Sequence, residues 1–466
     1  MNSFLWYDLE TFGTDKSIDR IAQAAFVRTD TDFHVLYERN LYCRIPDYYY
    51  PHPEACLVNG LTPQFVNEQG LSEATFADEI RKEITDPNTV IIGFNNLEFD
   101  DNFLKSLLFR TLFNPYEFEW VNTKWDILNL AKAMHDLRPE GVNWPPLDEN
   151  KGFPVFRLTE LTKANGIDQE GAHDALVDIK AMIEFAKQIK KINPKMLSYY
   201  FETRTKEQIL GKLQRDSYKV FLLTQFFHND YWKTCTHPML PLFYDNPDKP
   251  RTLYCYDLLL GIPESIEQAH GKNAFVKVAL NKYPSIAPLN VLPDNSSDTL
   301  GYDKQQCLRT AAEIMESGIF NSKEPIVDLV DSYLSSIDYS QTPPEEYRYR
   351  GQVPNQVFKK LSSFKAELKK GIRLSAPDFP DAPYYRDSVI CYVANNFQTL
   401  LTDEDKRRSE TIRESFILGT NHTSALSLES FINTIQQLST SFNEELSDKR
   451  AILDSLAEYA SRFVNR

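Results

Sequence analysis

The sequence predicts an α/β fold in three successive parts: an α/β domain over residues 1–195, a β-rich domain over 196–345 and a helical domain over 346–466. Three observations support this division. Apolar strand-like runs alternate with amphipathic helical patterns in the first part, and short β-rich runs separated by Pro, Asn, Asp and Gly fill the second. In the third part, apolar residues recur at three- and four-residue spacing.

The first part contains both strand and helix patterns. Apolar or alternating runs predict strands at 4–7, 20–29, 35–44 and 89–94. Amphipathic patterns predict helices at 73–84, 101–110, 125–134, 157–165 and 172–192, and we expect Pro194 to close the last of them. Elements in this order predict a sheet that is covered by helices.

The second and third parts differ in their sequence patterns. Runs at 219–227, 231–244, 251–260 and 274–284 are spaced as in a small antiparallel barrel or sandwich. A loop with two prolines near Pro343 leads into the third part, where helices are expected at 356–370, 402–417, 426–442 and 447–463.

The composition excludes several classes of protein. A hydrophobic content of 42%, with 13% aromatic residues, is enough for packed cores, so the chain is not disordered. Because the sequence has no long apolar run and no basic segment at its start, we expect no membrane span, no secretory signal and a cytoplasmic location. The six cysteines form no CxxC pair, which argues against structural zinc and favours a reducing compartment.

The net charge of −15 is too acidic for a protein that binds polyanions without specificity. The acidic excess is concentrated in residues 1–195, which hold 31 Asp and Glu against 20 Lys and Arg. Such an excess fits either a solvated surface or a cluster of carboxylates that binds metal cations.

The first motif with chemical content is Asp8-Leu9-Glu10, at the end of the first predicted strand. Residues two apart in a strand point to the same face, so the two carboxylates can converge on one metal ion. A single motif of this kind is also compatible with an exposed acidic strand end.

The second motif is Asn95-Asn96-Leu97-Glu98-Phe99-Asp100-Asp101, which follows the TVIIGF strand. A carboxylate at this junction lies at the rim of the sheet, where open α/β folds bind ligands. Asp100 and Asp101 are alternatively good N-caps for the next helix, so the pair leaves one carboxylate for chemistry.

The third motif runs from His173 to Asp178 at the start of a long amphipathic helix. Five residues correspond to about 140° around a helix, so the two side chains are not expected to bind one ion from the same face. Asp178 would then reach a metal while His173 reaches a water molecule. Alternatively this is only a polar helix start, in which Asp174 favours the helix dipole.

Together the motifs supply four carboxylates and one histidine. Oxygen ligands select hard cations such as Mg²⁺ or Mn²⁺. Two such ions stabilise the attacking and leaving oxygens of a phosphodiester, and histidine is well suited to accept a proton from water. The pattern therefore predicts metal-dependent phosphodiester hydrolysis.

In this order and spacing the motifs resemble the DEDDh branch of the DnaQ-like 3′→5′ exonucleases. The segments YDLETFGTD, GFNNLEFDD, LRPEGVNWP, RLTELTKANGI and AHDALVD are similar to stretches of the bacterial exodeoxyribonuclease I family, as is the three-part layout. The resemblance implies a ribonuclease-H-like exonuclease domain, an SH3-like β domain and a helical C-terminal domain. It further implies a monomer that degrades single-stranded DNA processively to nucleoside 5′-monophosphates in repair and recombination.

By the same resemblance, Asp8, Glu10, Asp100 and Asp178 would hold two Mg²⁺ ions, which Mn²⁺ can replace. His173 would act as the general base, and Glu10 would also contact the substrate.

Further residues would bind the DNA strand. Arg157 would hold a phosphate of the terminal nucleotides, and Lys105, Tyr116 and Trp120 would line the path of the DNA. Aromatic faces stack on bases of any identity, and Lys or Arg follows the backbone. Without the resemblance, core packing explains Tyr116 and Trp120 equally well.

In the second domain, the resemblance points to Lys277, Asn281 and Lys282 as DNA contacts. A solvated strand edge is an equally good explanation for these three residues.

The family also docks the acidic C-terminal tail of single-stranded DNA-binding protein on a basic ridge. Arg138, Tyr199 and Lys219 match positions in that ridge. Pro288 and Pro293 stand where polar or basic residues are expected, which predicts a weaker interaction.

Two other functions fit parts of the pattern. The same chemistry can trim RNA ends or proofread for a polymerase, although the extra domains favour a long single-strand channel. A catalytically silent binding module is the other alternative, but silent relatives usually lose at least one of the five residues, and all five are present here.

Overall fold

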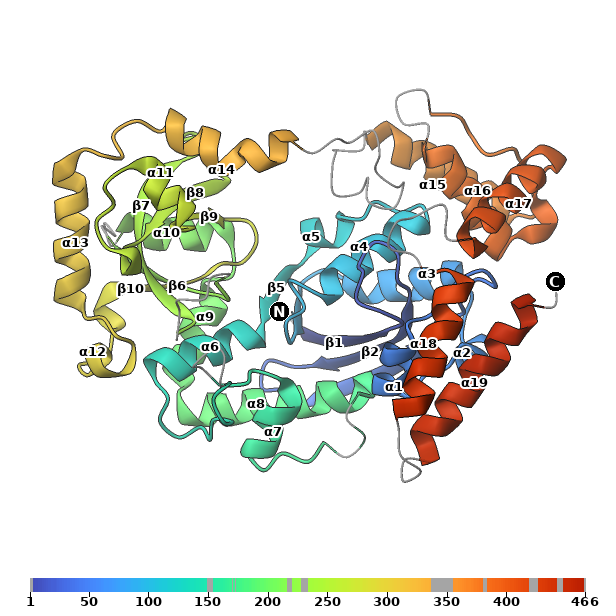
Figure 1. Cartoon of the computed structure of the whole chain (residues 1–466), viewed down its shortest axis with the longest axis horizontal. Helices are drawn as coiled ribbons and strands as arrows, with labels where there is room; N and C mark the ends of the chain where they lie inside the picture. The colour runs from blue at the N-terminus through green and yellow to red at the C-terminus, as the bar shows by residue number, and fades with distance from the viewer. Residues whose placement is uncertain are drawn as a thin grey trace.

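The structure, a computed structural model, describes residues 3–148, 154–169, 171, 173–215, 220–227, 234–336, 355–379, 384–418, 426–441 and 447–464. Figure 1 shows an α/β part at the centre, a β-rich part in green and yellow on one side, and a helical part in orange and red on the other. Within the described ranges, no helix combines the length and the apolar character needed to cross a bilayer.

The central sheet has five strands in the order β3-β2-β1-β4-β5. Their bounds are Ser3–Thr11 (β1), Ile21–Thr29 (β2), Val35–Tyr42 (β3), Thr89–Gly93 (β4) and Thr123–Asp126 (β5). β1 is antiparallel to β2 and parallel to β4, which is parallel to β5. The parallel pairing brings the carboxyl ends of β1 and β4 to the same edge of the sheet.

The four strands expected here are confirmed, but β5 is not predicted, and the helix expected at 125–134 begins only after this strand. Pro194 begins a further helix, α9, as proline often does in a first turn. The helices of this domain are α1 (Pro53–Asn59), α2 (Pro63–Gln69), α3 (Glu73–Ile84), α4 (Asp100–Arg110), α5 (Glu117–Val121), α6 (Ile127–Leu137), α7 (Leu158–Ala164), α8 (Ala175–Ile192) and α9 (Pro194–Glu202).

Different helices cover the two faces of the central sheet. Tyr7 and Leu9 pack in the core that α3 and α4 form on one face, whereas Trp6 packs in the core on the α6 and α8 face. Because side chains alternate along a strand, Asp8 and Glu10 lie on the same face as Trp6. They are therefore directed toward α8.

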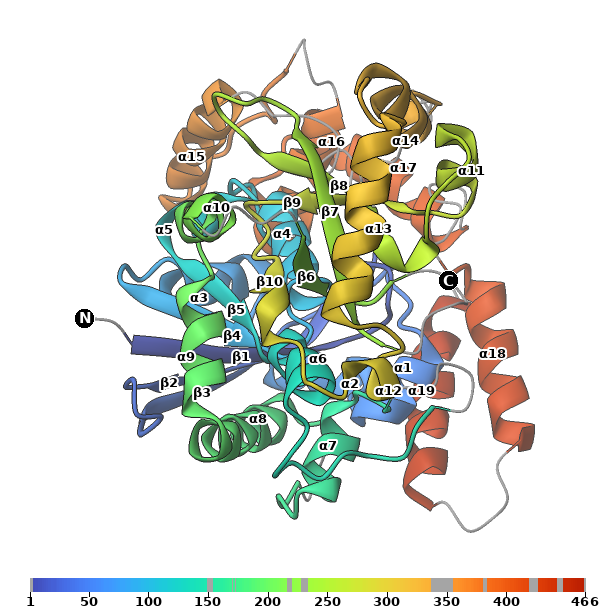
Figure 2. The ribbon, with the colours of Figure 1, turned by 90° about the vertical axis from the view of Figure 1, so that its left-hand side faces the viewer.

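The second domain contains an antiparallel sheet in the order β10-β6-β7-β8-β9. Its strands are β6 (Phe221–Thr224), β7 (Thr236–Tyr244), β8 (Thr252–Asp257), β9 (Phe275–Ala279) and β10 (Ser285–Pro288). The expected antiparallel β unit is thus observed, but its helices are not predicted. These are α10 (Lys206–Arg215), α11 (Ile266–Gly271), α12 (Ser296–Thr299), α13 (Lys304–Ser317) and α14 (Glu324–Ser336), and α13 runs beside the sheet in Figures 1 and 2.

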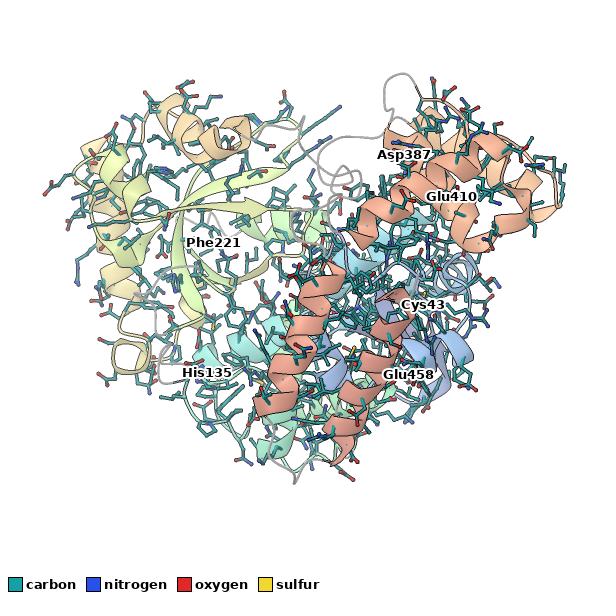
Figure 3. All side chains as sticks on the ribbon, turned by 45° about the vertical axis from the view of Figure 1, so that its right-hand side comes forward. Cys43, His135, Phe221, Asp387, Glu410 and Glu458 are labelled. Carbon is teal, nitrogen blue, oxygen red and sulfur yellow. The ribbon has the colours of Figure 1, made fainter. Side chains whose placement is uncertain are left out.

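The third domain is helical, as expected. Its helices are α15 (Asn355–Lys369), α16 (Tyr384–Asn396), α17 (Asp403–Ile417), α18 (Leu428–Ser441) and α19 (Ser447–Val464), of which α16 is not predicted. α15 to α17 share a core with Phe109 and Leu112 of the first domain, and α18 and α19 share one with residues around α1 and α2. In Figure 3, Asp387 marks α16 and Glu410 marks α17 above the first domain. Both groups therefore pack directly on the first domain.

Candidate active site

The carboxyl end of β1 presents the first two candidate ligands. Asp8 and Glu10 are both partly exposed, while Leu9 between them is buried. The pairing of β1 with β2 becomes irregular between Glu10 and Thr11, so the strand departs from regular pairing directly after the motif. The two carboxylates thus sit on one face at an open end of the sheet.

Asp100 joins them from the first turn of α4. It is 4% exposed, and its Oδ1 accepts a hydrogen bond from the backbone N–H of Leu9 at 3.1 Å. The suggestion that Asp100 or Asp101 caps this helix is wrong, because the N-cap is Phe99 and no side chain caps the helix. Instead, Asp101 accepts hydrogen bonds from Tyr7 Oη and Lys124 Nζ, both at 2.6 Å. Asp100 is therefore the carboxylate left to the site.

Asp178 and His173 come from the start of α8. Asp178 Oδ1 accepts hydrogen bonds from Gln169 Nε2 at 2.7 Å and from the backbone N–H of His173 at 3.3 Å. His173 precedes the helix with a left-handed φ of 71° and is exposed. The ligand atoms of Glu10, His173 and Asp178 all lie within 4.8 Å of one another.

This proximity corrects the helical-spacing argument made from the sequence. The angle of about 140° applies only within a continuous helix, and α8 begins at Ala175, after His173. The left-handed turn instead folds His173 back toward Asp178, so both side chains can reach one ion or one water molecule.

Gln23 supports this arrangement and is not predicted from the sequence. It is 1% exposed and pairs with Glu10 across β1 and β2. Its Nε2 donates to Asp174 Oδ2 at 3.1 Å, and its Oε1 accepts from the N–H of Ala175 at 3.3 Å. Asp174 in turn is the N-cap of α8. Gln23 thereby fixes the start of α8 against the strand, and the only sequence signal is a polar residue in an apolar run.

Burial and mutual repulsion shift the titration of the four acids. Burial, and then the neighbouring carboxylates, raise the pKa of Asp8 well above its usual range and that of Glu10 to about 9. Burial and then Asp101 raise the pKa of Asp100 to about 8, and burial raises the pKa of Asp178. The cluster therefore lacks positive charge, and a divalent cation would supply it.

The donor set fits hard cations. Carboxylate oxygens of Asp8, Glu10, Asp100 and Asp178 are the ligands that Mg²⁺ and Mn²⁺ prefer. His173 adds one nitrogen within reach of Glu10 and Asp178. These residues are the ones that would hold the metal.

Three of the residues that are expected to contact the DNA lie around α5. Lys105 Nζ is 2.8 Å from Glu119 Oε1 and 5.6 Å from the centre of the Tyr116 ring. Trp120 is 67% exposed, so core packing does not explain it. Tyr116 is half-buried and precedes α5 directly.

Trp120 and Asn281 meet in one cleft of about 230 Å³ between α5 and the β9–β10 turn, although 161 residues separate them in the chain. Arg204 and Lys206 also line this cleft. We name it the α5 cleft. It brings two basic side chains next to an exposed indole ring.

Other expected contacts are placed differently. Lys277 lies outside the lining of the α5 cleft and is 2.6 Å from Asp331 of α14. Lys282 is exposed in the turn after β9, and Arg157 is exposed at the N-cap of α7, where its side chain makes no capping bond.

Two residues of the expected ridge, Arg138 and Tyr199, lie where the first two domains meet. Arg138 Nη1 donates to the carbonyl of Val291 at 2.9 Å, close in sequence to Pro293. Tyr199 is partly buried, with Lys212 Nζ 4.5 Å from its ring centre. Lys219 lies outside the described residues.

The sequence matches known family models and known proteins. Residues 5–186 match the Exonuclease family model, and residues 349–463 match the Exonuclease I C-terminal domain. Exodeoxyribonuclease I of Haemophilus influenzae is 36% identical over 348 residues, covering 70% of this chain and 72% of the relative. Exodeoxyribonuclease I of Escherichia coli is 36% identical over 363 residues, covering 72% and 76%.

Solved structures agree along the whole chain. Escherichia coli exonuclease I in complex with a dA16 oligonucleotide has a TM-score of 0.85 and 28% identity, covering 99% of this chain and all of the other. A zinc-bound form of the same enzyme with single-stranded DNA has a TM-score of 0.84 and 29% identity over the full length of both chains. An SSB/exonuclease I structure has a TM-score of 0.83 and 28% identity, covering 99% of both chains.

Proposed function

The chain belongs to the exodeoxyribonuclease I family, and from that premise we propose that it hydrolyses single-stranded DNA from the 3′ end and releases nucleoside 5′-monophosphates. The observation that carries the proposal is the gathering of Glu10, His173 and Asp178 within 4.8 Å, beside Asp8 and Asp100. Trimming of RNA ends and a silent binding role are not favoured, because the named relatives are deoxyribonucleases.

Exonucleases of this superfamily depend on divalent metal ions, and we propose Mg²⁺ as the ion used here. Asp8, Glu10, Asp100 and Asp178 would hold two ions. Bound there, the ions would stabilise both the attacking and the leaving oxygen of the phosphodiester.

The chain's own residues would position and deprotonate the attacking water. His173 is exposed beside Glu10 and Asp178, so its ring can accept the water proton as the new P–O bond forms. The bond between phosphorus and the 3′ oxygen of the preceding nucleotide breaks, and that oxygen takes up a proton. The products are a nucleoside 5′-monophosphate and a strand one nucleotide shorter.

We place the DNA strand in the α5 cleft on its way to the carboxylates. Trp120 offers an exposed ring on which a base can stack, and Arg204 and Lys206 supply positive charge for the phosphates. Asn281 reaches the same cleft from the second domain. Arg157 would contact the terminal phosphates from α7.

A docking site for the tail of single-stranded DNA-binding protein is proposed near Arg138 and Tyr199. The related SSB/exonuclease I structure supports an interaction of this kind, and the placement rests on the resemblance of these positions to the family's ridge. Because the Arg138 side chain already binds the Val291 carbonyl, we expect the interaction here to be weak.

The proposed function is tested by following strands of single-stranded DNA, double-stranded DNA and RNA labelled at one end. We expect shortening from the 3′ end of single-stranded DNA in Mg²⁺ and none in EDTA. Asp178→Ala should abolish hydrolysis while strand binding stays measurable, and Glu184→Ala, which removes a carboxylate from the exposed face of the same helix, should not. Activity that persists in Asp178→Ala, or equal digestion of RNA, would contradict the proposal.

A further inference from the structure

The carboxylate of Asp178 is held by two donors that lie between α7 and α8. Asp178 is 9% exposed, and both hydrogen bonds that it accepts from described residues go to the same oxygen, Oδ1. One comes from Gln169 Nε2 at 2.7 Å, and the other from the backbone N–H of His173 at 3.3 Å. Two donors on one oxygen restrict the rotation of the carboxylate and leave Oδ2 for a cation.

The Gln169 side chain is itself fixed by Thr162 of α7. Gln169 Oε1 lies 2.5 Å from Thr162 Oγ1, and Thr162 is fully buried. An ionised carboxylate only accepts hydrogen bonds, so the amide NH₂ group of Gln169 must face Asp178 and the amide oxygen must face Thr162. The hydroxyl of Thr162 consequently donates to this oxygen, although the carbonyl of Leu158 lies at 2.9 Å. Thr162, Gln169 and Asp178 thus form a chain of hydrogen bonds with one direction.

The packing of α7 against α8 does not depend on this chain alone. Leu161 of α7 and Ile179 of α8 belong to the same buried core. A second amide, Gln188 Nε2 of α8, donates to the carbonyl of Asn165, directly after α7, at 3.3 Å. Gln169 differs from Gln188 because its bond ends on a candidate metal ligand.

We propose that Gln169 is a positioning residue that orients the Asp178 carboxylate for a bound divalent cation, with Thr162 setting the direction of its amide. The inference rests on the proposed function, in which Asp178 is a metal ligand. Partners that orient metal ligands from behind typically contribute about 10–100-fold in metal affinity or activity. Gln169 makes the shorter of the two bonds to Oδ1, so its loss should leave Asp178 free to rotate.

The test is calorimetric titration of the full-length protein with Mn²⁺ in the absence of DNA, which measures cation binding without turnover. Gln169→Ala should lower the affinity for Mn²⁺ by about 10–100-fold. Thr162→Val keeps the size of the side chain but removes the hydroxyl, so it should lower the affinity by a smaller factor. Thr162→Ser keeps the hydroxyl and should restore most of the affinity.

Gln188→Ala is the matched control, because it removes another half-buried amide that joins the same two helices and does not contact Asp178. It should bind Mn²⁺ like the unaltered chain. In rate measurements on single-stranded DNA, Gln169→Ala should raise the Mg²⁺ concentration for half-maximal rate by a factor similar to its loss of Mn²⁺ affinity, while the KM for DNA stays the same. A residue that only stabilised the fold would not shift this concentration.

Two outcomes would overturn the inference alone. One is unchanged Mn²⁺ affinity in Gln169→Ala when Asp178→Ala has lost binding, and the other is an equal loss in Gln188→Ala. If the unaltered chain binds no Mn²⁺, or if Asp178→Ala binds it equally tightly, the proposed function fails together with the inference. If Gln169→Ala does not fold, Thr162→Val decides, and unchanged affinity in that variant overturns the inference.

Discussion

Lys124 Nζ lies 2.6 Å from Asp101 Oδ2, and the two side chains are only 1% and 3% exposed. The same ammonium group is 2.9 Å from Oε1 of Glu119, on α5. Asp101 is thereby neutralised inside the fold, which leaves the adjacent Asp100 as the carboxylate of this pair for the proposed active site. Lys124 also ties the helix that bears Asp100 to the helix that bears Trp120.

Replacing Lys124 with Met should destabilise the protein by about 3–5 kcal/mol, because removing one partner of a buried pair leaves an uncompensated charge. Chemical denaturation measures the loss. The double variant Lys124→Met with Asp101→Asn should recover part of it, since the buried charge is gone. A loss below about 1 kcal/mol in the single variant would show that the pair is not buried in solution.

His173→Ala should lower kcat by about 10²–10⁴-fold with little change in affinity for single-stranded DNA, as expected for a general base. His34→Ala, which removes an exposed histidine paired with Asp30, is the control. Because His173 lies within 4.8 Å of Glu10 and Asp178, the Mg²⁺ concentration for half-maximal rate should also be measured. A large increase in that concentration would assign His173 to metal binding instead.

Trp120→Ala should weaken binding of single-stranded DNA by about 1–3 kcal/mol, because one stacked base loses its platform. The ring is 67% exposed, so stability should hardly change. Trp120→Phe keeps an aromatic face and should restore most of the affinity. Fluorescence anisotropy with a labelled oligonucleotide in EDTA compares the unaltered chain with the two variants. Equal affinities would show that the DNA does not pass through the α5 cleft.

The sequence predicts which acidic residues form the cluster, because the position of each one follows from local structure. The two-residue period of a strand places Asp8 and Glu10 on one face, and the junction after TVIIGF places Asp100 at the rim. That Asp100 lies beside β1 depends on the pairing of β1 with β4, and that Glu10 meets Asp178 depends on the packing of α8, neither of which single motifs specify.

The missed features have physical reasons. β5 carries the buried charged residues Lys124 and Asp126, so its sequence has the pattern of a polar segment and not of a buried strand. α16 buries Ile390 as well as Tyr385, Val389 and Tyr392, and Ile390 lies about 140° around the helix from Tyr385, so the buried residues do not form the single apolar stripe that reveals a surface helix. Gln23 acts through a partner 151 residues away, a relationship that only the fold creates.

Removal of metal should make stability depend on pH. Glu10 and Asp100, with pKa values raised to about 9 and about 8, stay protonated in the metal-free fold while the unfolded chain releases their protons above about pH 4. The metal-free protein should therefore lose stability as pH rises from about 4 to about 9. Bound Mg²⁺ removes this loss, because the ionised carboxylates are then paired.

The measurement is the melting temperature in EDTA and in Mg²⁺ at several pH values. The increase caused by Mg²⁺ should be larger near pH 8.5 than near pH 5.5, each value being approximate. Glu10→Gln should reduce the difference, whereas Glu184→Ala should not. An equal increase at both pH values would contradict the assignment of the metal to these carboxylates.

Lys365 should make the stability of the protein depend on pH whether or not metal is bound. It is 5% exposed on α15, donates to the carbonyl of Thr111 at 2.7 Å and lies over the ring of Phe113. Burial lowers its pKa to about 7. In the unfolded chain a lysine keeps its proton up to about pH 10.4, so folding releases a proton between these two values.

Stability should consequently rise with pH from about 7 to about 10 by a few kcal/mol relative to Lys365→Met, which keeps the apolar stem but cannot titrate. Below pH 7 the difference should be constant, because the ammonium group is then present in both states. Denaturation of both proteins across this range gives the difference directly. Lys369→Met, one turn away at a half-exposed position, should give a flat difference. A flat difference for Lys365→Met as well would mean that its amine stays charged where the third domain meets the first.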